Sequence, residues 1–426
     1  RMADETRRAL RRCRAADAAQ HFLDPQPCRG PSPKRMVFFG TGRSPYGSGE
    51  AEIKSSGYGY KQSGFFYECE DEKAKRNMLW FYVRAAERAA FPGGKQENER
   101  SGNMRKVAIV GTGNISPEHI KGYLTFPERC RIVALVDIYP EKAEEKKKTF
   151  GLDAAVYASH TEMLEKEDVD LVSICTPPYT HAAIAIDCLN AGKDVLVEKP
   201  MANTTAECDR MLAAAARSGR KLAVGHLQRF FPANRAVREL VTSEKLGRFC
   251  MFSERRTIDY FSADRPLWFL DRRTAGGGIV MNYGAHVLDK LFCLTPSEGA
   301  AVYASCGNAK NSRNIEGHAQ MLLKFPSGLS AAVTFSGYGP SGYDTFYDFT
   351  RGTVRVQSGT ILSYTTDGEW HSTEIRSDGK HMERQLEAFC RYIQSGTADI
   401  ATGEYGRRIV ETIERIYRSA ESALEC

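Results

Sequence analysis

Between residues 104 and 225, short apolar runs alternate with longer stretches in which apolar and charged residues are mixed. A continuous apolar run of about four to eight residues is typical of a strand buried on both faces of a sheet. A repeated strand–helix pattern predicts a parallel, doubly wound sheet with helices on both sides. The predicted strands are 106–110, 132–136, a short one near Val156, 171–175, 194–197 and 221–225, and the predicted helices are 117–124, 142–150, the alanine-rich stretch after His181, and 204–218.

From residue 249 onward the pattern changes to consecutive strands separated by turn signals such as Pro326-Ser-Gly328. Strands that follow one another without intervening helices predict a large, mostly antiparallel sheet. The predicted strands are 249–258, 300–306, 320–325, 330–336, 353–356 and 361–364, and helices are expected over 384–393 and 406–422. We therefore expect an α/β domain over 104–226 and an α+β domain over 227–426, with the C-terminal helix packing back onto the first domain.

Residues 1–103 differ from the rest of the chain, because arginine, glycine, serine and proline are scattered there without periodicity. All of the net charge of +6 lies in this part, since 104–426 holds 40 basic and 40 acidic residues. Glu99-Arg100-Ser101 can be encoded by a ribosome-binding sequence just before the codon for Met104. We expect a non-native or disordered extension, with Met104 as the start; a genuine extension and, more weakly, a transit peptide stay open.

Composition excludes several classes of function. No run approaches the ~18 apolar residues of a membrane span. The twelve cysteines include no Cys-x-x-Cys pair, which argues against a structural zinc site, and we expect no metal. The balanced charge of 104–426 argues against binding to nucleic acid.

A glycine-containing loop lies between the first predicted strand and the first predicted helix. Gly111 permits a tight turn, Gly113 allows the backbone to approach a pyrophosphate, and the helix N-terminus offers free N–H groups to the phosphate charge. Ser116 takes the place of the usual third glycine and is expected to be the N-cap. The sequence therefore predicts a Rossmann-type site for a dinucleotide. Its expected loop contacts are Gly111, Thr112, Gly113, Asn114 and Ile115.

Asp137 ends the second strand, about 25 residues after the glycine loop. A carboxylate at this place accepts hydrogen bonds from the adenosine ribose hydroxyls and repels a 2′-phosphate. No arginine follows it directly, so NAD is favoured over NADP.

The other predicted strands of this domain end in polar tripeptides. Thr176 and Pro177 follow one strand, and Glu198 and Lys199 end the next. The carboxyl ends of parallel strands meet at one edge, so these residues are expected around the cofactor, together with His181. Lys199 is placed to bind the nicotinamide ribose and to reach a substrate hydroxyl; a snorkelling surface lysine is the alternative.

The motifs 111–115, 176–181 and 191–200 together resemble the Gfo/Idh/MocA family, which includes glucose–fructose oxidoreductase and inositol dehydrogenase. The resemblance extends over essentially all of 104–426. In that family the lysine of the glutamate–lysine–proline tripeptide is catalytic or positions the substrate. The resemblance implies this role for Lys199.

A second candidate segment follows a triple glycine at 276–278. Asn282, His286 and Asp289 have the i, i+4, i+7 spacing of one helix face. The family resemblance implies that this segment lines the substrate pocket and that His286 is the general acid or base, which suits an imidazole. Many members have aspartate where this chain has Asn282, which leaves the acid–base partner of His286 open.

Other pocket candidates rest on residue type alone. Trp268 could stack on a sugar or belong to the core. Arg229, with His226, could line the cofactor cleft. Arg265, Arg272 and Arg273 could bind a phosphate or carboxylate, but surface salt bridges are the favoured interpretation.

The combined expectation is NAD-dependent hydride transfer to or from a secondary alcohol of a sugar, sugar derivative or cyclitol. An NAD-dependent glycosidase of the same fold and a non-enzymatic dinucleotide or sugar sensor are the alternatives. A small-molecule substrate, no nucleic acid, no membrane and a homodimer or homotetramer are expected. The nine scattered cysteines after Met104 suit the cytoplasm.

Overall fold

The computed structural model describes residues 104–295, 300–309, 313–366 and 368–422; the expectations for 1–103 lie outside these residues. The first domain is built on a six-stranded sheet in the order β3-β2-β1-β4-β5-β6, in which all pairs are parallel. This confirms the doubly wound sheet. Its strands are β1 (Arg105–Val110), β2 (Cys130–Val136), β3 (Ala155–Tyr157), β4 (Leu171–Ile174), β5 (Asp194–Glu198) and β6 (Leu222–Gly225).

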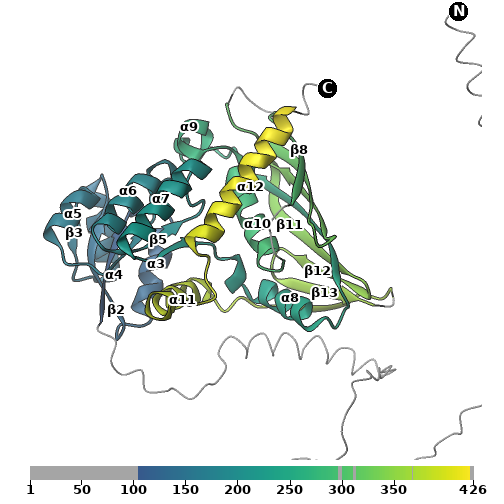
Figure 1. Cartoon of the computed structure of the whole chain (residues 1–426), viewed down its shortest axis with the longest axis horizontal. Coiled ribbons are helices and arrows are strands. Elements are labelled where there is room, and N and C mark those ends of the chain that lie inside the picture. Colours follow the sequence, from purple (N-terminus) through teal and green to yellow (C-terminus); the bar gives the residue numbers. More distant parts are fainter. Residues whose placement is uncertain (1–103, 296–299, 310–312, 367, 423–426) are drawn as a thin grey trace, which may run out of the picture. The chain divides into compact units, whose positions relative to one another are not determined.

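Helices cover both faces of this sheet, which explains why its strands read as continuous apolar runs. Side chains of α3, α4 and α11 pack on one face, and side chains of α5, α6, α7 and α12 pack on the other (Figure 1). The helices are α3 (Ser116–Leu124), α4 (Pro140–Phe150), α5 (His160–Lys166), α6 (Pro178–Asn190), α7 (Thr205–Ser218), α11 (His381–Ser395) and α12 (Gly403–Ser422).

The second domain holds an eight-stranded sheet in the order β14-β13-β12-β11-β7-β10-β9-β8. Its neighbouring strands are antiparallel except β7 and β10, which run parallel, so the mostly antiparallel sheet is confirmed. The strands are β7 (Phe249–Asp259), β8 (Ala301–Gly307), β9 (His318–Lys324), β10 (Ser330–Ser336), β11 (Tyr338–Phe349), β12 (Gly352–Gln357), β13 (Ile361–Thr365) and β14 (His371–Glu374).

Two of these strands, β11 and β14, are not among the predicted ones. After Tyr338, β11 continues with Gly339-Pro340-Ser341-Gly342, a turn-like sequence without alternation. It nevertheless pairs with β7 on one side and with β12 on the other. Hydrogen bonds to these two neighbours stabilise it as a strand although its first residues have no strand pattern.

One face of the second sheet is covered by α8 (Pro232–Ser243), α10 (Ala285–Phe292) and α12 (Figure 1). Helix α12 contributes to both cores, because Ile409 and Ile413 pack with the second sheet while Val410 packs with the first. Helix α11 packs on α3 through Leu386, whose Cδ1 leaves no room for a Cβ at Gly122. These two helices attach the C-terminal part of the chain to the dinucleotide-type sheet.

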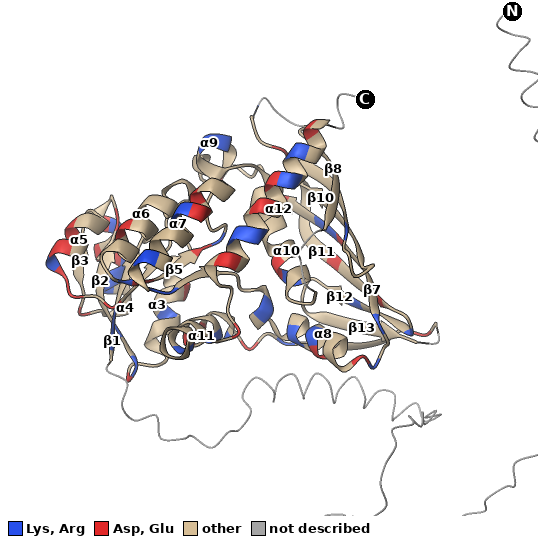
Figure 2. Ribbon diagram, viewed as in Figure 1, with Lys and Arg blue, Asp and Glu red and all other residues tan. Residues whose placement is uncertain are grey.

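Acidic and basic residues are mixed over the helices of both domains, and along α12 the two signs alternate (Figure 2). None of the helices in the described part of the chain combines the length and the apolar composition needed to cross a membrane.

Candidate active site

The loop between β1 and α3 has the geometry of a nucleotide cradle. Gly111 has φ +94°, and a Cβ there would lie 2.8 Å from the backbone of Cys175 and Thr176, so only glycine fits. Gly113 and Asn114 are exposed beside it, and nothing lies within 4 Å of a Cβ added at Gly113. Ile115 directly precedes α3. The loop thus leaves an open approach to the N-terminus of α3, where a pyrophosphate fits.

The prediction that Ser116 is an N-cap is wrong. Ser116 is the first helical residue, its N–H donates to the Gly113 carbonyl at 3.2 Å, and its hydroxyl donates to the same oxygen at 2.9 Å. The tight turn from Gly113 begins the helix one residue early, which makes the hydroxyl a donor instead of a capping acceptor. Ser116 is fully buried, and its small side chain leaves α3 close to the sheet.

Asp137 lies at the end of β2 and faces the glycine loop. Its Oδ2 accepts from the Thr112 N–H and hydroxyl, both at 2.8 Å, and its Oδ1 accepts from the Tyr139 N–H at 3.0 Å. These bonds hold the carboxylate in one orientation. A carboxylate has about four acceptor positions, so one on Oδ1 remains for a ribose hydroxyl.

The ends of β4 and β5 are joined by a buried imidazole. One ring nitrogen of His181 lies 2.8 Å from the Thr176 carbonyl oxygen and the other lies 3.0 Å from that of Pro200. His181, predicted to contact the cofactor, is completely buried. The structure therefore gives it a positioning part, holding the Thr176–Pro177 turn against the loop that follows Lys199.

Glu198, also predicted to contact the cofactor, faces inward. Its Oε1 lies 2.8 Å from Nε2 of His119, a fully buried residue of α3 that sequence reasoning missed. Although burial opposes a charge at each group, their mutual contact keeps the pKa of Glu198 lowered, and Cys175 and Glu198 raise the pKa of His119 to about 10. Gly225 is required here, because a Cβ would lie 2.8 Å from Glu198 Oε1. The pair anchors α3 to the strand end that carries Lys199.

Lys199 connects the two domains. Its Nζ donates to Oδ1 of Asn282 at 2.7 Å. Burial lowers the pKa of Lys199 to about 8, against the opposing effect of Glu198. The positive charges of Arg265 and Arg256 contribute to this lowering. A lysine with this pKa changes charge near neutral pH, as functional lysines do.

His286 lies one turn beyond Asn282 and is partly exposed. Burial holds its pKa well below the usual range, and the charges of Lys199 and Arg256 act in the same direction. Its Nδ1 has no hydrogen-bond partner in the part of the chain that the structure describes. A neutral imidazole beside the Lys199–Asn282 contact can accept a proton.

The segment that carries Asn282 is a π-helix, Val280–Gly284, and not the first turn of a regular α-helix. The Glu316 carboxylate holds its entry: it accepts from the N–H groups of Gly278 and Val280 and from the Tyr417 hydroxyl, each at 2.9 Å. A Cβ at Gly278 would lie 2.1 Å from the Glu316 carbonyl oxygen, and one at Gly277 would lie 1.9 Å from the Tyr417 hydroxyl. The triple glycine is therefore needed for close approach.

Asp289, the third residue of the predicted face, is fully buried and lies away from Lys199. It accepts from Arg229 Nη2 at 3.1 Å, from the Tyr405 hydroxyl at 2.9 Å and from the Gln228 N–H at 3.0 Å. Arg229, expected to line the cofactor cleft, is thus engaged in an interior ion pair. His226 lies nearby with neither ring nitrogen bonded within the described residues, and burial lowers its pKa to about 4.

The remaining aromatic and arginine candidates separate into two groups. Arg273 pairs with Asp271 at 2.6 Å and Arg272 lies 3.8 Å from Glu421, so both make the favoured surface salt bridges. Trp268 stacks on Phe269 with ring centroids 3.7 Å apart. Arg265 has no such pair. The structure adds Arg256 of β7, whose charge acts on both Lys199 and His286. In the sequence Arg256 is one of two adjacent arginines within a strand, with no motif that marks it.

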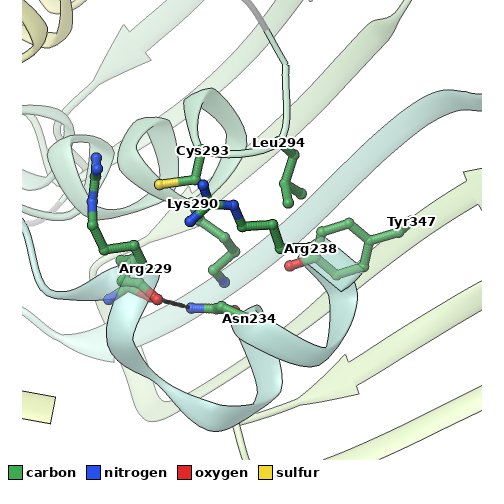
Figure 3. Close-up of a pocket in the computed structure, with 8 residues that line it drawn as sticks. Arg229, Asn234, Arg238, Lys290, Cys293, Leu294 and Tyr347 are labelled. Carbon is green, nitrogen blue, oxygen red and sulfur yellow. Dashed lines mark hydrogen bonds between the residues drawn. The ribbon is translucent and has the colours of Figure 1, made fainter. Parts of the chain in front are cut away.

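A small pocket lies between α8 and α10, apart from the Lys199–Asn282 contact (Figure 3). Three cations line it, but each has an acidic partner: Arg229 has Asp289, Arg238 has Asp399 and Lys290 has Glu254. The eight lining residues are Gln228, Arg229, Asn234, Arg238, Lys290, Cys293, Leu294 and Tyr347. Since its charges are balanced, this pocket is not a second anion site.

Among the described residues, no three histidine, cysteine or acidic side chains gather as metal ligands would. The open glycine loop, the oriented Asp137 and the lysine at the same sheet edge fit a bound dinucleotide. Two domains, one shaped for a dinucleotide and one presenting polar groups to it, define a nucleotide-dependent oxidoreductase class.

Comparison with known proteins identifies the family. Residues 105–226 match the oxidoreductase family with an NAD-binding Rossmann fold, and residues 234–362 match the GFO/IDH/MocA C-terminal domain. The two matches together span more than half of the chain. The chain therefore belongs to the Gfo/Idh/MocA family of NAD-binding oxidoreductases, as the sequence motifs predicted.

Individual relatives are similar over different lengths. The chain is 36% identical over 234 residues to 1-carboxy-3-chloro-3,4-dihydroxycyclohexa-1,5-diene dehydrogenase of Comamonas testosteroni, covering 55% of this chain but only 58% of that protein. It is 26% identical over 343 residues to D-glucoside 3-dehydrogenase of Escherichia coli strain K12, covering 74% and 95%. The crystal structure of aldose–aldose oxidoreductase from Caulobacter crescentus aligns with a TM-score of 0.68 and 28% identity, covering 75% and 98%.

The orientation of Asp137 generates a prediction about cofactor choice. Asp137→Asn preserves acceptors for Thr112 but removes the negative charge that repels a 2′-phosphate. We expect the ratio of NADP to NAD affinity to rise by at least ~10-fold, corresponding to about 1.4 kcal/mol. Titration of each nucleotide followed by protein fluorescence measures both affinities. Asp153→Asn, at an exposed acid of the same domain, should leave the ratio unchanged, and an unchanged ratio in Asp137→Asn would contradict the role of Asp137.

Proposed function

We propose that this protein catalyses NAD-dependent hydride transfer to or from a carbon that bears a secondary alcohol in a sugar, sugar derivative or cyclitol. The observation that carries the proposal is the 2.7 Å contact between Lys199 and Asn282, which joins the nucleotide domain to the helix that presents His286. Bound NAD supplies the hydride acceptor or donor at C4 of its nicotinamide.

The substrate class is supported by the relatives. The Escherichia coli protein is named for a glucoside, and proteins from Saccharopolyspora erythraea and Burkholderia cenocepacia are named inositol 2-dehydrogenases. The Comamonas testosteroni protein is named for a carboxylated cyclic diol. Rings that carry neighbouring hydroxyl groups are common to these names, and we propose such a ring for this chain.

Each polar side chain then has a distinct task. In the oxidation direction, neutral His286 accepts the hydroxyl proton while the hydride leaves the same carbinol carbon. Lys199, as an ammonium, donates to the carbinol oxygen and stabilises the carbonyl that forms, while Asn282 orients the lysine and a substrate hydroxyl. Reduction reverses these transfers, with His286 returning the proton.

Removing either group should slow the reaction without removing the nucleotide site. We expect Lys199→Ala and His286→Ala each to lower kcat by at least ~10²-fold, because general acid–base groups contribute about 10²–10⁴-fold. The assay follows reduced nicotinamide by absorbance over a panel of sugars and cyclitols, with NAD binding measured separately. Lys121→Ala removes an exposed lysine paired with Glu118 and serves as the matched control.

Near-normal turnover in both Lys199→Ala and His286→Ala would refute the assignment. Hydrolysis of a glycoside by the wild type without net NADH formation would indicate the glycosidase alternative instead. NAD and sugar binding without turnover of either kind would indicate a sensor.

The pKa of about 8 for Lys199 generates a pH dependence. Because the protonated form is required to polarise the carbinol oxygen, kcat/KM for alcohol oxidation should be flat below pH 8 and fall above it. His286, whose pKa lies well below 6.5, stays neutral over this range and therefore causes no further change of kcat/KM with pH. Rate profiles from pH 6 to pH 10 measure the limb, which Lys199→Ala should lack. A rate that rises through pH 8 would make neutral Lys199 the base and reverse the two roles.

We also propose that the protein is a homo-oligomer that uses the sheet face that no described helix covers. Apolar side chains are in register there: Tyr303 of β8 lies opposite Leu322 of β9, which lies opposite Ala332 of β10. Tyr303 is 65% exposed and Leu322 58% exposed, which is unusual for large apolar side chains on one surface. The free cysteines of the described residues support a reducing compartment, and we propose the cytoplasm.

Leu322→Arg tests this surface. We expect light scattering after gel filtration to show an oligomer for the wild type and a smaller particle for Leu322→Arg, because a buried unpaired charge costs several kcal/mol. Leu124→Arg, at a half-exposed leucine of α3, should leave the mass unchanged. A monomeric wild type, or an oligomer unaffected by Leu322→Arg, would contradict the proposal.

A further inference from the structure

Two arginines of the second domain, Arg256 and Arg265, act electrostatically on Lys199, and among the described residues neither has a carboxylate to itself. Arg256 belongs to β7, and its guanidinium donates to Glu254 Oε1 through Nε at 3.0 Å and Nη2 at 2.8 Å. The same guanidinium lies 4.1 Å from the ring centroid of Tyr343 and 5.6 Å from that of Tyr283. One carboxylate and two aromatic faces therefore hold it rigidly.

Glu254 does not belong to Arg256 alone. Its other oxygen, Oε2, accepts from Lys290 Nζ at 2.5 Å and from the Thr345 hydroxyl at 2.8 Å. Glu254 and Lys290 are both buried, so water does not screen them. A single carboxylate thus lies between two cationic side chains.

Arg265, unlike Arg256, does not share a carboxylate with another cation; among the described residues it has no acidic partner. It lies in the turn between β7 and the short helix η2 (Leu267–Leu270), with its guanidinium 4.4 Å from the Tyr260 ring and 5.2 Å from the Phe269 ring. Its Nε is enclosed without a hydrogen bond, and it makes no ion pair with any acid in 104–295, 300–309, 313–366 or 368–422. Arg265 as a whole is partly exposed, so its charge is not fully desolvated, but its buried Nε is left for a ligand or water to satisfy.

A chain of ring contacts leads from Arg265 to the reacting groups. Tyr260 meets Tyr283 edge-on at 6.2 Å between centroids, and Tyr283 lies 6.2 Å from the His286 ring. Arg256 lies over the same Tyr283 ring. The charges of both arginines also lower the pKa of Lys199, which places them within electrostatic reach of its ammonium.

We propose that the substrate carries an anionic group, a carboxylate or a phosphate ester, which Arg265 and Arg256 bind beside the reacting carbinol. Planar guanidinium groups match both anions and form strong charge-assisted hydrogen bonds with them. The anion gives Arg265 the acidic partner that it lacks and offsets the excess of positive charge around Lys199. The inference rests on the proposed function and narrows its substrate class from neutral polyols to acidic ones.

Matched substrates that differ in one group test the charge requirement. D-glucose, D-glucuronate and D-glucose 6-phosphate share a ring and differ at C6; D-galactose with D-galacturonate and myo-inositol with myo-inositol 1-phosphate extend the panel. We expect an anionic member to exceed its neutral counterpart in kcat/KM by about 10- to 100-fold, the range of a hydrogen bond to a charged group. The glucuronate and phosphate arms distinguish the two kinds of anion.

Arginine variants assign the effect to its residue. Arg265→Gln should lower the ratio of kcat/KM for anionic over neutral substrate by at least ~10-fold, mainly through KM, and Arg265→Lys should restore part of it because a charge remains. Arg273→Gln is the matched control, since that arginine is exposed, lies eight residues later and is paired with Asp271. It should leave the ratio unchanged.

The outcomes separate this inference from the proposed function. Turnover that favours neutral substrates, with a ratio unaffected by Arg265→Gln, overturns the inference and leaves the hydride-transfer function standing. If no panel member is turned over, calorimetry of the four acidic compounds with the NADH-loaded protein decides. Binding that Arg265→Gln abolishes supports the anion site even though the proposed function fails, and no binding of any of the four overturns the inference.

Discussion

The hydrogen bond from Lys199 to Asn282 is the contact on which the arrangement of the candidate site depends. Each partner is placed by its own domain: β5 brings Lys199 to the sheet edge, and the π-helical segment brings Asn282 to it. The first placement needs the His119–Glu198 pair behind the strand, and the second needs Glu316 under the glycines. Loss of the His119–Glu198 pair or of Glu316 would therefore separate Lys199 from Asn282, although neither of these two residues is itself replaced.

Charge inside the protein follows a simple division. Several buried charges face an opposite charge: Arg229 pairs with Asp289 and His119 with Glu198, while Glu254 is shared by Lys290 and Arg256. Such pairs are costly to break and suit a structural part. Buried polar atoms without a partner occur at several places in the described residues, and two of them, Nε of Arg265 and Nδ1 of His286, belong to side chains within electrostatic reach of Lys199. Unpartnered polar groups beside candidate catalytic residues mark a place where a bound ligand would supply hydrogen-bond partners.

The sequence was sufficient for the nucleotide domain because its evidence is local. Strand, loop and helix follow one another from 105 to 124, so Gly111 and Asp137 could be placed from spacing alone. Long-range contacts could not be predicted from the sequence. His181 and Glu198 lie at the strand ends as expected, but their partners, the Pro200 carbonyl oxygen and His119, come from other parts of the fold. Strand β11 was missed because its neighbours, and not its composition, make it a strand.

Specificity lies in the part of the chain that sequence patterns describe least. The sequence offered Arg265 only as one of three possible anion ligands and gave no signal for Arg256, and it is the contacts with Tyr260 and Tyr283 that link the two arginines to the segment carrying His286. The same two charges lower the pKa of Lys199. An anion bound between them would offset this effect and favour the ammonium form of the lysine. Recognition of the substrate and protonation of the group that polarises it are therefore coupled through one electrostatic field.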